Sequence, residues 1–96
     1  MNRTAALTLL KAHKLVLAER FGVARLALFG STARDTAGPD SDVDVLVAFD
    51  GLATSERYFG VQFYLEDLLS RIIYLVTEKA LRERLRADVE RDAIAV

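Results

Sequence analysis

Apolar residues recur along the chain at two different spacings, which separate predicted helices from predicted strands. Over residues 4–20 they return at three- or four-residue steps, a spacing typical of an amphipathic helix, and Gly22 is placed to end that helix. Residues 23–29 and 43–49 are short, nearly continuous apolar runs, and each predicts a strand. Because the second run is apolar on both faces beyond Asp44, it is typical of a central strand.

The second half of the chain continues the alternation of helix and strand. Residues 55–70 predict a helix, whose apolar stripe comprises Phe59, Phe63, Leu65, Leu68 and Leu69. We expect the aromatic residues of this helix, Phe59, Phe63 and Tyr64, to pack in the core, although so small a domain can leave some apolar surface for a partner. Residues 72–76 predict a third strand, and Thr77 is placed to cap a last helix over residues 78–91, in which Leu81, Leu85 and Val89 repeat every four residues. The tail at 93–96 fits neither class.

Between the first two strands the sequence predicts a short helix at 31–34, and then a loop over residues 35–41 that contains Gly38-Pro39. The order of elements predicts an α/β (α+β) fold in which helices flank a small mixed β-sheet. With 96 residues, the chain has room for one hydrophobic core, so we expect a single domain over residues 1–96.

Composition and charge narrow the classes of function. Lys and Arg (13) nearly balance Asp and Glu (14), so no strong field gathers nucleic acid, and no nucleic-acid partner is expected. The chain has no cysteine, which excludes disulfides, thiolate zinc sites and cysteine nucleophiles. The apolar residues near the N-terminus are interrupted by Lys11, His13 and Lys14, so neither a signal peptide nor a membrane span is expected. We therefore expect a cytoplasmic protein with no membrane partner.

Asp42 and Asp44 form a candidate metal site at the start of the second strand. Because side chains alternate along a strand, both carboxylates are expected on one face and Val43 on the other. Two carboxylates so close raise each other's pKa unless a cation lies between them, and hard oxygen ligands suit Mg²⁺. A calcium-binding EF-hand loop starting at Asp40 is excluded, since Val45 and Gly51 stand where that loop needs Gly and Glu.

Gly30 and Ser31 form a candidate phosphate site where the first strand ends. A glycine lets a ligand approach the backbone closely, and the Ser31 hydroxyl and neighbouring N–H groups can bind an anion. Arg34 is placed to pair with a phosphate. Either motif alone is more often an ordinary turn. The eleven-residue step from Ser31 to Asp42 brings both motifs to one end of the sheet.

Taken together, the motifs resemble the signature of the DNA polymerase β-like nucleotidyltransferase superfamily. The matching pattern is an apolar strand, Gly30-Ser31-x-Ala33-Arg34, a loop, and Ser41-Asp42-x-Asp44-x-x-Val47. The chain is most similar to the minimal nucleotidyltransferase (MNT) family, whose members are of about this length. The resemblance extends over nearly the whole chain, including the leading helix, residues 64–69, the strand end at 75–77 and the Arg-rich last helix.

This resemblance implies a nucleotidyltransferase fold and the role of antitoxin in a HEPN/MNT toxin–antitoxin pair. Some members of the family transfer AMP from ATP to a tyrosine of the HEPN-domain toxin. Carried onto this sequence, Gly30 and Ser31 would bind the triphosphate, and Asp42 and Asp44 would bind Mg²⁺ as catalytic residues. A HEPN-domain toxin and ATP are the expected partners. The sequence leaves open whether the chain also forms an oligomer.

The chain departs from the family pattern at one position, and two alternatives follow from it. The superfamily usually has a third carboxylate on the later strand, where this chain has Tyr74, and a tyrosine cannot replace a carboxylate as a metal ligand at neutral pH. The alternative to an enzyme is thus a catalytically impaired MNT-fold module that neutralises its toxin by stoichiometric contact. Transfer to a small molecule is disfavoured, because 96 residues cannot supply a second domain for the acceptor. The only histidine, His13, is expected to have a packing or surface role.

Overall fold

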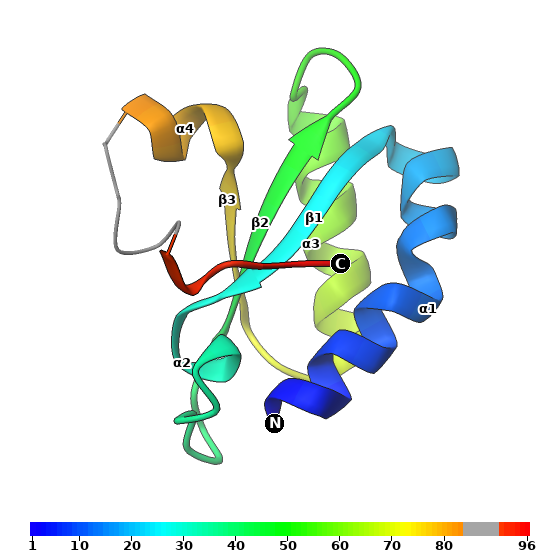
Figure 1. The fold of residues 1–96 in the computed structure, drawn as a ribbon. Helices are drawn as coiled ribbons and strands as arrows, with labels where there is room; N and C mark the ends of the chain where they lie inside the picture. The colour runs from blue at the N-terminus through cyan, green and yellow to red at the C-terminus, as the bar shows by residue number, and fades with distance from the viewer. Residues whose placement is uncertain (84–90) are drawn as a thin grey trace.

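The computed structural model describes residues 1–83 and 91–96 of the chain. The elements are α1 (Arg3–Phe21), β1 (Val23–Phe29), α2 (Gly30–Ala33), β2 (Val43–Phe49), α3 (Ser55–Leu69), β3 (Ile73–Thr77), α4 (Glu78–Glu83) and β4 (Ile94–Ala95) (Figure 1). Every element predicted before residue 83 is present, with boundaries within two residues of those expected. Residues 84–90 of the predicted last helix, which include Leu85 and Val89, lie outside the described residues.

The strands form one mixed sheet in the order β3-β2-β1-β4, which confirms the predicted fold class. β1 pairs antiparallel with β2 and β4, whereas β2 pairs parallel with β3, so β2 is a central strand as expected. The tail that fitted neither class is the edge strand β4, in which Ile94 and Ala95 pair with Leu28 and Ala27. The end of the chain is thereby attached to β1.

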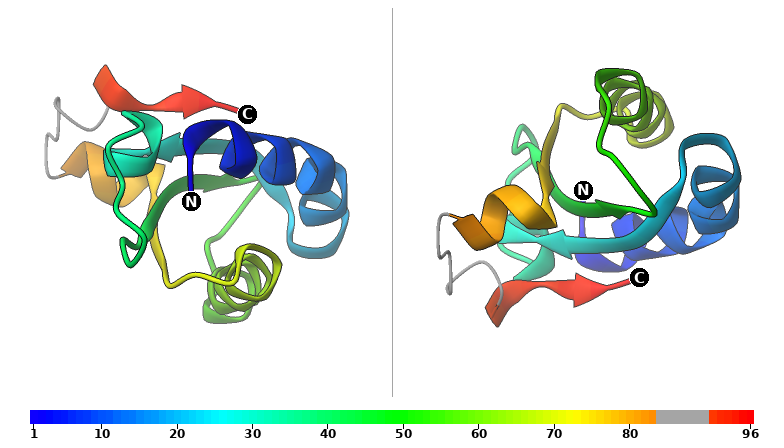
Figure 2. Two further views of the ribbon diagram at one scale, coloured as in Figure 1. Left: turned by 90° about the horizontal axis from the view of Figure 1, so that it is seen from below. Right: turned by 90° about the horizontal axis from the view of Figure 1, so that it is seen from above.

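The two faces of the sheet are buried to different extents. Figures 1 and 2 show α1 and α3 on one face and α4 on the other. The buried side chains of β2 alternate along the strand and pack against α1 and α3. They are Val43, Val45 and Val47. The face toward α4 holds a smaller cluster around Phe29 and Leu81. Among the described residues, no helix is long and apolar enough to cross a membrane.

Local capping accounts for where the helices begin and end. α1 ends at Gly22, whose φ of 71° is left-handed and whose N–H donates to the Ala18 and Leu17 carbonyls, so the predicted glycine cap is confirmed. α3 begins after Thr54, whose Oγ1 accepts a hydrogen bond from Arg57 N at 3.2 Å. Thr77 caps α4 as predicted, because its Oγ1 accepts from Ala80 N at 3.2 Å.

The prediction that Phe59 and Phe63 pack in the core is wrong. Their side chains are 50% and 64% exposed, and their rings stack on each other with centroids 6.2 Å apart. The buried stripe of α3 is Val61, Leu65 and Leu69. Since each helical residue turns by about 100°, Phe59 and Phe63 lie on a different face from this stripe. Tyr64 does pack against the core.

Tyr64 also joins α3 to α1 through the only histidine. The Tyr64 Oη lies 2.5 Å from Nδ1 of His13, and the two rings meet edge to face. Both side chains are half-buried. The packing role expected for His13 is therefore what the structure shows.

Side chains of α3 cover the outer edge of β3. The Tyr58 hydroxyl donates to the Leu75 carbonyl at 2.5 Å, and Gln62 Nε2 donates to the Ile73 carbonyl at 3.3 Å. The Ile73 N–H donates to Glu66 Oε2 at 3.4 Å. An uncovered edge strand can pair with another chain, so these three side chains block addition of a further strand at β3.

Candidate functional site

The structure brings the predicted phosphate and metal residues together at one end of the sheet. Gly30 and Ser31 begin α2 directly after β1, and Phe29, the last residue of β1, pairs with Asp44 of β2. The loop at 35–41 returns the chain from α2 to Asp42. The antiparallel pairing of β1 with β2 thus places Asp44, the last residue of the predicted metal motif, beside Gly30, the first residue of the predicted phosphate motif.

Gly30 is required by the Asp44 side chain itself. Its φ of +71° lies in the left-handed region, and a Cβ added there would lie 2.0 Å from Asp44 Oδ2. The glycine that was expected to admit a ligand has the protein's own Asp44 carboxylate against its backbone instead. Any larger residue would displace the Asp44 carboxylate from the junction of β1 and α2.

The charge environment of Asp44 suits a bound cation. Burial raises the pKa of this half-buried carboxyl above its ordinary value, the nearby Asp42 charge raises it further, and Arg34 lowers it. The negative charges of Asp42 and Asp44 therefore repel each other. A divalent ion held between them would relieve this repulsion, and carboxylate oxygens are ligands that Mg²⁺ accepts. The residues present fit such an ion.

No third acidic ligand completes the site within the described part of the chain. There, no group of three His, Cys, Asp or Glu side chains is arranged to hold a metal ion. The parallel register pairs Asp44 with Tyr74, so the exposed Tyr74 stands where the resemblance expected a carboxylate. Two other acids have partners of their own: Glu66 accepts from Ile73 N, and Asp50 pairs with Arg57 at 2.9 Å. Water and substrate phosphates would have to supply the remaining ligands.

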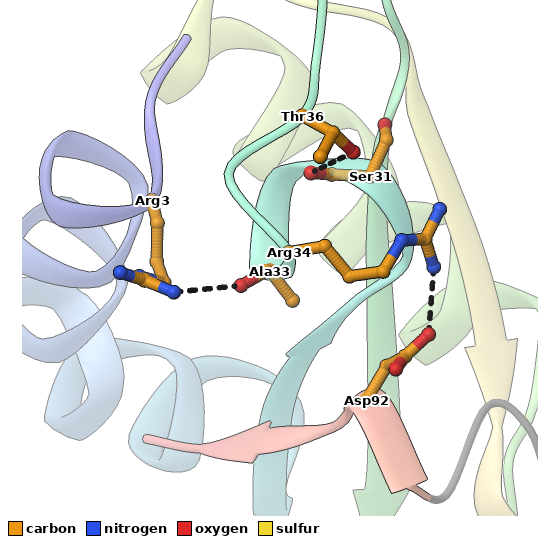
Figure 3. A network of polar contacts seen from close by, with 6 residues as sticks. All are labelled: Arg3, Ser31, Ala33, Arg34, Thr36 and Asp92. Carbon is orange, nitrogen blue, oxygen red and sulfur yellow. Dashed lines mark hydrogen bonds and ion pairs between the residues drawn. The ribbon is translucent and has the colours of Figure 1, made fainter.

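The turn after α2 is held by hydrogen bonds to Ser31 and by the start of α1. The Ser31 carbonyl accepts from Thr36 N at 2.9 Å and from Thr36 Oγ1 at 3.4 Å (Figure 3). Arg3 contributes two bonds: its backbone N–H donates to Asp35 Oδ1 at 3.0 Å, and its Nη1 donates to the Ala33 carbonyl at 3.4 Å. The backbone from Ser31 to Thr36 is therefore held by its own hydrogen bonds and by Arg3.

Arg34 reaches an acid that the sequence did not indicate. Its Nη1 donates to Asp92 Oδ2 at 2.6 Å, across 58 residues of sequence (Figure 3). Its positive charge also acts on Asp44. Asp92 lies just before β4, whose pairing with β1 was not predicted, so no local pattern could have found this contact.

Comparison with known proteins places this geometry in a family. The family model described as "Nucleotidyltransferase domain" matches residues 10–96. "Protein adenylyltransferase MntA" of Thermococcus cleftensis is 38% identical over 89 residues, which are 93% of this chain and 90% of that protein. A solved structure whose name places it among minimal nucleotidyltransferases is 38% identical, with a TM-score of 0.82 over 100% of this chain and 97% of that one.

A more distant solved structure shares the fold. It is a toxin–antitoxin with AMP-PNP, 19% identical, with a TM-score of 0.69 over 99% of this chain and 72% of that one. At this identity the similarity shows the fold alone. The family model, which covers most of the chain, and the 38% identical relatives show membership of the family in addition to the fold. This chain belongs to the nucleotidyltransferase domain family, among the minimal nucleotidyltransferases.

Proposed function

We propose that this chain is a Mg²⁺-dependent nucleotidyltransferase that transfers AMP from ATP to a HEPN-type toxin, and so acts as an antitoxin. The observation that carries the proposal is the Asp44 carboxylate held against the Gly30 backbone, with Asp42 beside it. This junction joins a carboxylate pair to the start of the turn that carries Ser31. The chain would act as a single cytoplasmic domain.

Each residue of the junction would have a distinct part in the transfer. Ser31 would donate its hydroxyl hydrogen to a phosphate oxygen, and Gly30 leaves room for the Asp44 carboxylate beside the backbone. Asp42 and Asp44 would hold Mg²⁺, which when bound offsets the negative charge on the phosphate oxygens. Arg34 would pair with a phosphate through its guanidinium. The hydroxyl oxygen of the acceptor would bond to the α-phosphorus, while the bond between the α- and β-phosphates breaks, pyrophosphate leaves and the hydroxyl proton passes to water.

The relatives support the choice of substrate and acceptor. The Thermococcus relative is named a protein adenylyltransferase, which indicates AMP transfer to a protein. The toxin–antitoxin structure contains AMP-PNP, an ATP analogue, which supports both ATP and a toxin as partners.

A second candidate function rests on Tyr74. Because this tyrosine stands beside Asp44 in register, the described residues supply two carboxylates to the site, where three are usual in the superfamily. A chain that had lost catalysis in this way would still bind its toxin and neutralise it by stoichiometric contact. The identity of residue 74 separates the two functions.

The test is transfer of label from α-³²P ATP, in the presence of Mg²⁺, to a HEPN-type toxin encoded beside this chain. Wild type, Asp44→Ala and Tyr74→Asp are compared at equal concentrations. We expect wild type to label the toxin and Asp44→Ala to leave it unlabelled. If Tyr74→Asp alone labels the toxin, the enzyme proposal is wrong and the binding module is correct.

A further inference from the structure

The ion pair between Arg34 and Asp92 connects the candidate site to the end of the chain. The Nη1–Oδ2 distance is 2.6 Å, and the Asp92 side chain is 27% exposed while that of Arg34 is 51% exposed. Figure 3 shows the two side chains pointing toward each other from the residue after α2 and from the segment before β4. An exposed ion pair stabilises a fold very little, so stability alone gives no strong reason for this contact.

The position of Asp92 is fixed relative to Gly30. Two residues after Asp92 the chain enters β4, which pairs with β1 at Leu28 and Ala27. Val96 N donates to the Leu26 carbonyl at 2.9 Å, and Lys14 Nζ donates to the Val96 carbonyl at 2.7 Å. Gly30 follows the last residue of β1, so the same strand sets the positions of the Asp92 carboxylate and of the predicted phosphate site.

The guanidinium geometry allows Arg34 to bind a phosphate while it is held by Asp92. Arginine has five N–H donors in a rigid plane, and the bond to Asp92 uses one nitrogen, Nη1. Within the described residues, no hydrogen bond from Arg34 Nε or Nη2 is found. Those two nitrogens form the edge that binds a phosphate in bidentate fashion. Arg34 N also donates to the Gly30 carbonyl at 3.1 Å, so Arg34 lies one helical turn from the start of the candidate phosphate site.

We propose that Asp92 is a positioning residue, which holds Arg34 through Nη1 so that its Nε–Nη2 edge faces the phosphates of a nucleotide bound at Gly30 and Ser31. This inference rests on the proposed function, since it requires a nucleotide at that junction. It makes β4 a functional part of the site, because β4 carries Asp92 to Arg34. It also predicts that removal of the Asp92 charge weakens binding of the nucleotide.

If Asp92 only competes with the nucleotide for Arg34, removal of its charge is expected to raise the affinity for MgATP. A carboxylate that occupies the phosphate-binding group must be displaced by ATP, and its charge repels the triphosphate, so its removal would tighten binding. If Asp92 positions Arg34, removal frees a long side chain that must then be ordered on binding, and ATP binds more weakly. We expect the affinity for MgATP to fall about three- to tenfold.

The experiment measures MgATP binding by isothermal titration calorimetry, without a partner protein. Wild type, Asp92→Asn, Arg34→Gln and the double variant form a mutant cycle. The matched control is Glu78→Gln, because Glu78 forms a comparable ion pair with Arg25, at 2.7 Å, outside the candidate site. We expect Asp92→Asn to weaken binding, Glu78→Gln to leave it unchanged, and Asp92→Asn to have no further effect once Arg34 is Gln.

Arg34→Lys provides a test that leaves the segment before β4 intact. Lysine keeps the charge and can still contact Asp92, but it has no second edge for a phosphate, so binding should weaken nearly as much as in Arg34→Gln. Arg34→Lys with wild-type affinity would overturn the proposal, as would Asp92→Asn with unchanged or tighter binding. If wild type itself binds no MgATP, the proposed function fails, and the inference fails with it. The wild-type titration thus separates the two failures.

Discussion

Replacement of Gly30 by alanine tests the packing that defines the candidate site. The new Cβ would lie 2.0 Å from Asp44 Oδ2 and 2.9 Å from its Cγ, so the Asp44 side chain must rotate away. A left-handed conformation costs an alanine roughly 1–2 kcal/mol, and forcing the Asp44 side chain from its rotamer adds about 1 kcal/mol. The sum is about 2–3 kcal/mol, which for a domain of this size lowers Tm by roughly 8–24 °C.

Thermal unfolding of Gly30→Ala is compared with that of Gly38→Ala. A Cβ at Gly38 would lie 3.7 Å from Ser41 Oγ, an ordinary contact, and Gly38 has no positive φ. The Asp44→Ala background separates the two costs, because without the carboxylate only the backbone cost of Gly30→Ala remains, roughly 1–2 kcal/mol. Equal Tm values for Gly30→Ala and Gly38→Ala would refute the reasoning, and so would fully additive effects of Gly30→Ala and Asp44→Ala.

Three further predictions concern charge, packing and the covered edge of β3. The pKa of Asp44 is raised in the folded state. The free energy of unfolding therefore falls as pH rises from the ordinary aspartate range through that pKa. Asp44→Asn removes this loss, so it should raise Tm at pH 7 without metal but not in strong acid. Leu65→Ala should cost about 2–5 kcal/mol in urea unfolding, against about 0.5 kcal/mol or less for the exposed Phe63→Ser, and equal losses would contradict the burial pattern. Tyr58→Phe removes the bond to the Leu75 carbonyl and should cost about 1 kcal/mol in the same assay, whereas no loss would show that this bond contributes nothing.

The sequence predicted the elements correctly where the local pattern of residues and the buried face of the element agree. The strand β2 is recognisable because its alternate residues Val43, Val45 and Val47 are all buried. The pair Asp42 and Asp44 is named as a candidate site because residues two apart in an extended segment project to the same side, and its role as a metal site stays a prediction. The caps at Gly22 and Thr77 follow from residue types with strong positional preferences.

Hydrophobicity did not identify the buried face of α3. The helix carries two apolar stripes, one at Val61, Leu65 and Leu69 and the other at Phe59 and Phe63, and composition does not decide which one meets the sheet. The position of the helix over β3 decides it, since Tyr58, Gln62 and Glu66 bond to the edge of that strand. That position depends on the whole fold.

Contacts between distant segments account for the rest of what the sequence left open. β4 is two residues long, which is too short for a periodic pattern, and its strand conformation is defined by its pairing with β1. The Arg34–Asp92 contact depends on that pairing. The role of Gly30 likewise depends on where the neighbouring strand places Asp44.

The position of the label in ATP tests nucleotidyl transfer most directly. Wild-type protein is incubated with Mg²⁺ and the toxin, using ATP labelled at the α-phosphate in one reaction and at the γ-phosphate in the other. Transfer of AMP predicts label on the toxin from α-labelled ATP, with the γ label released in pyrophosphate. Label on the toxin from γ-labelled ATP, or from neither, would contradict the account.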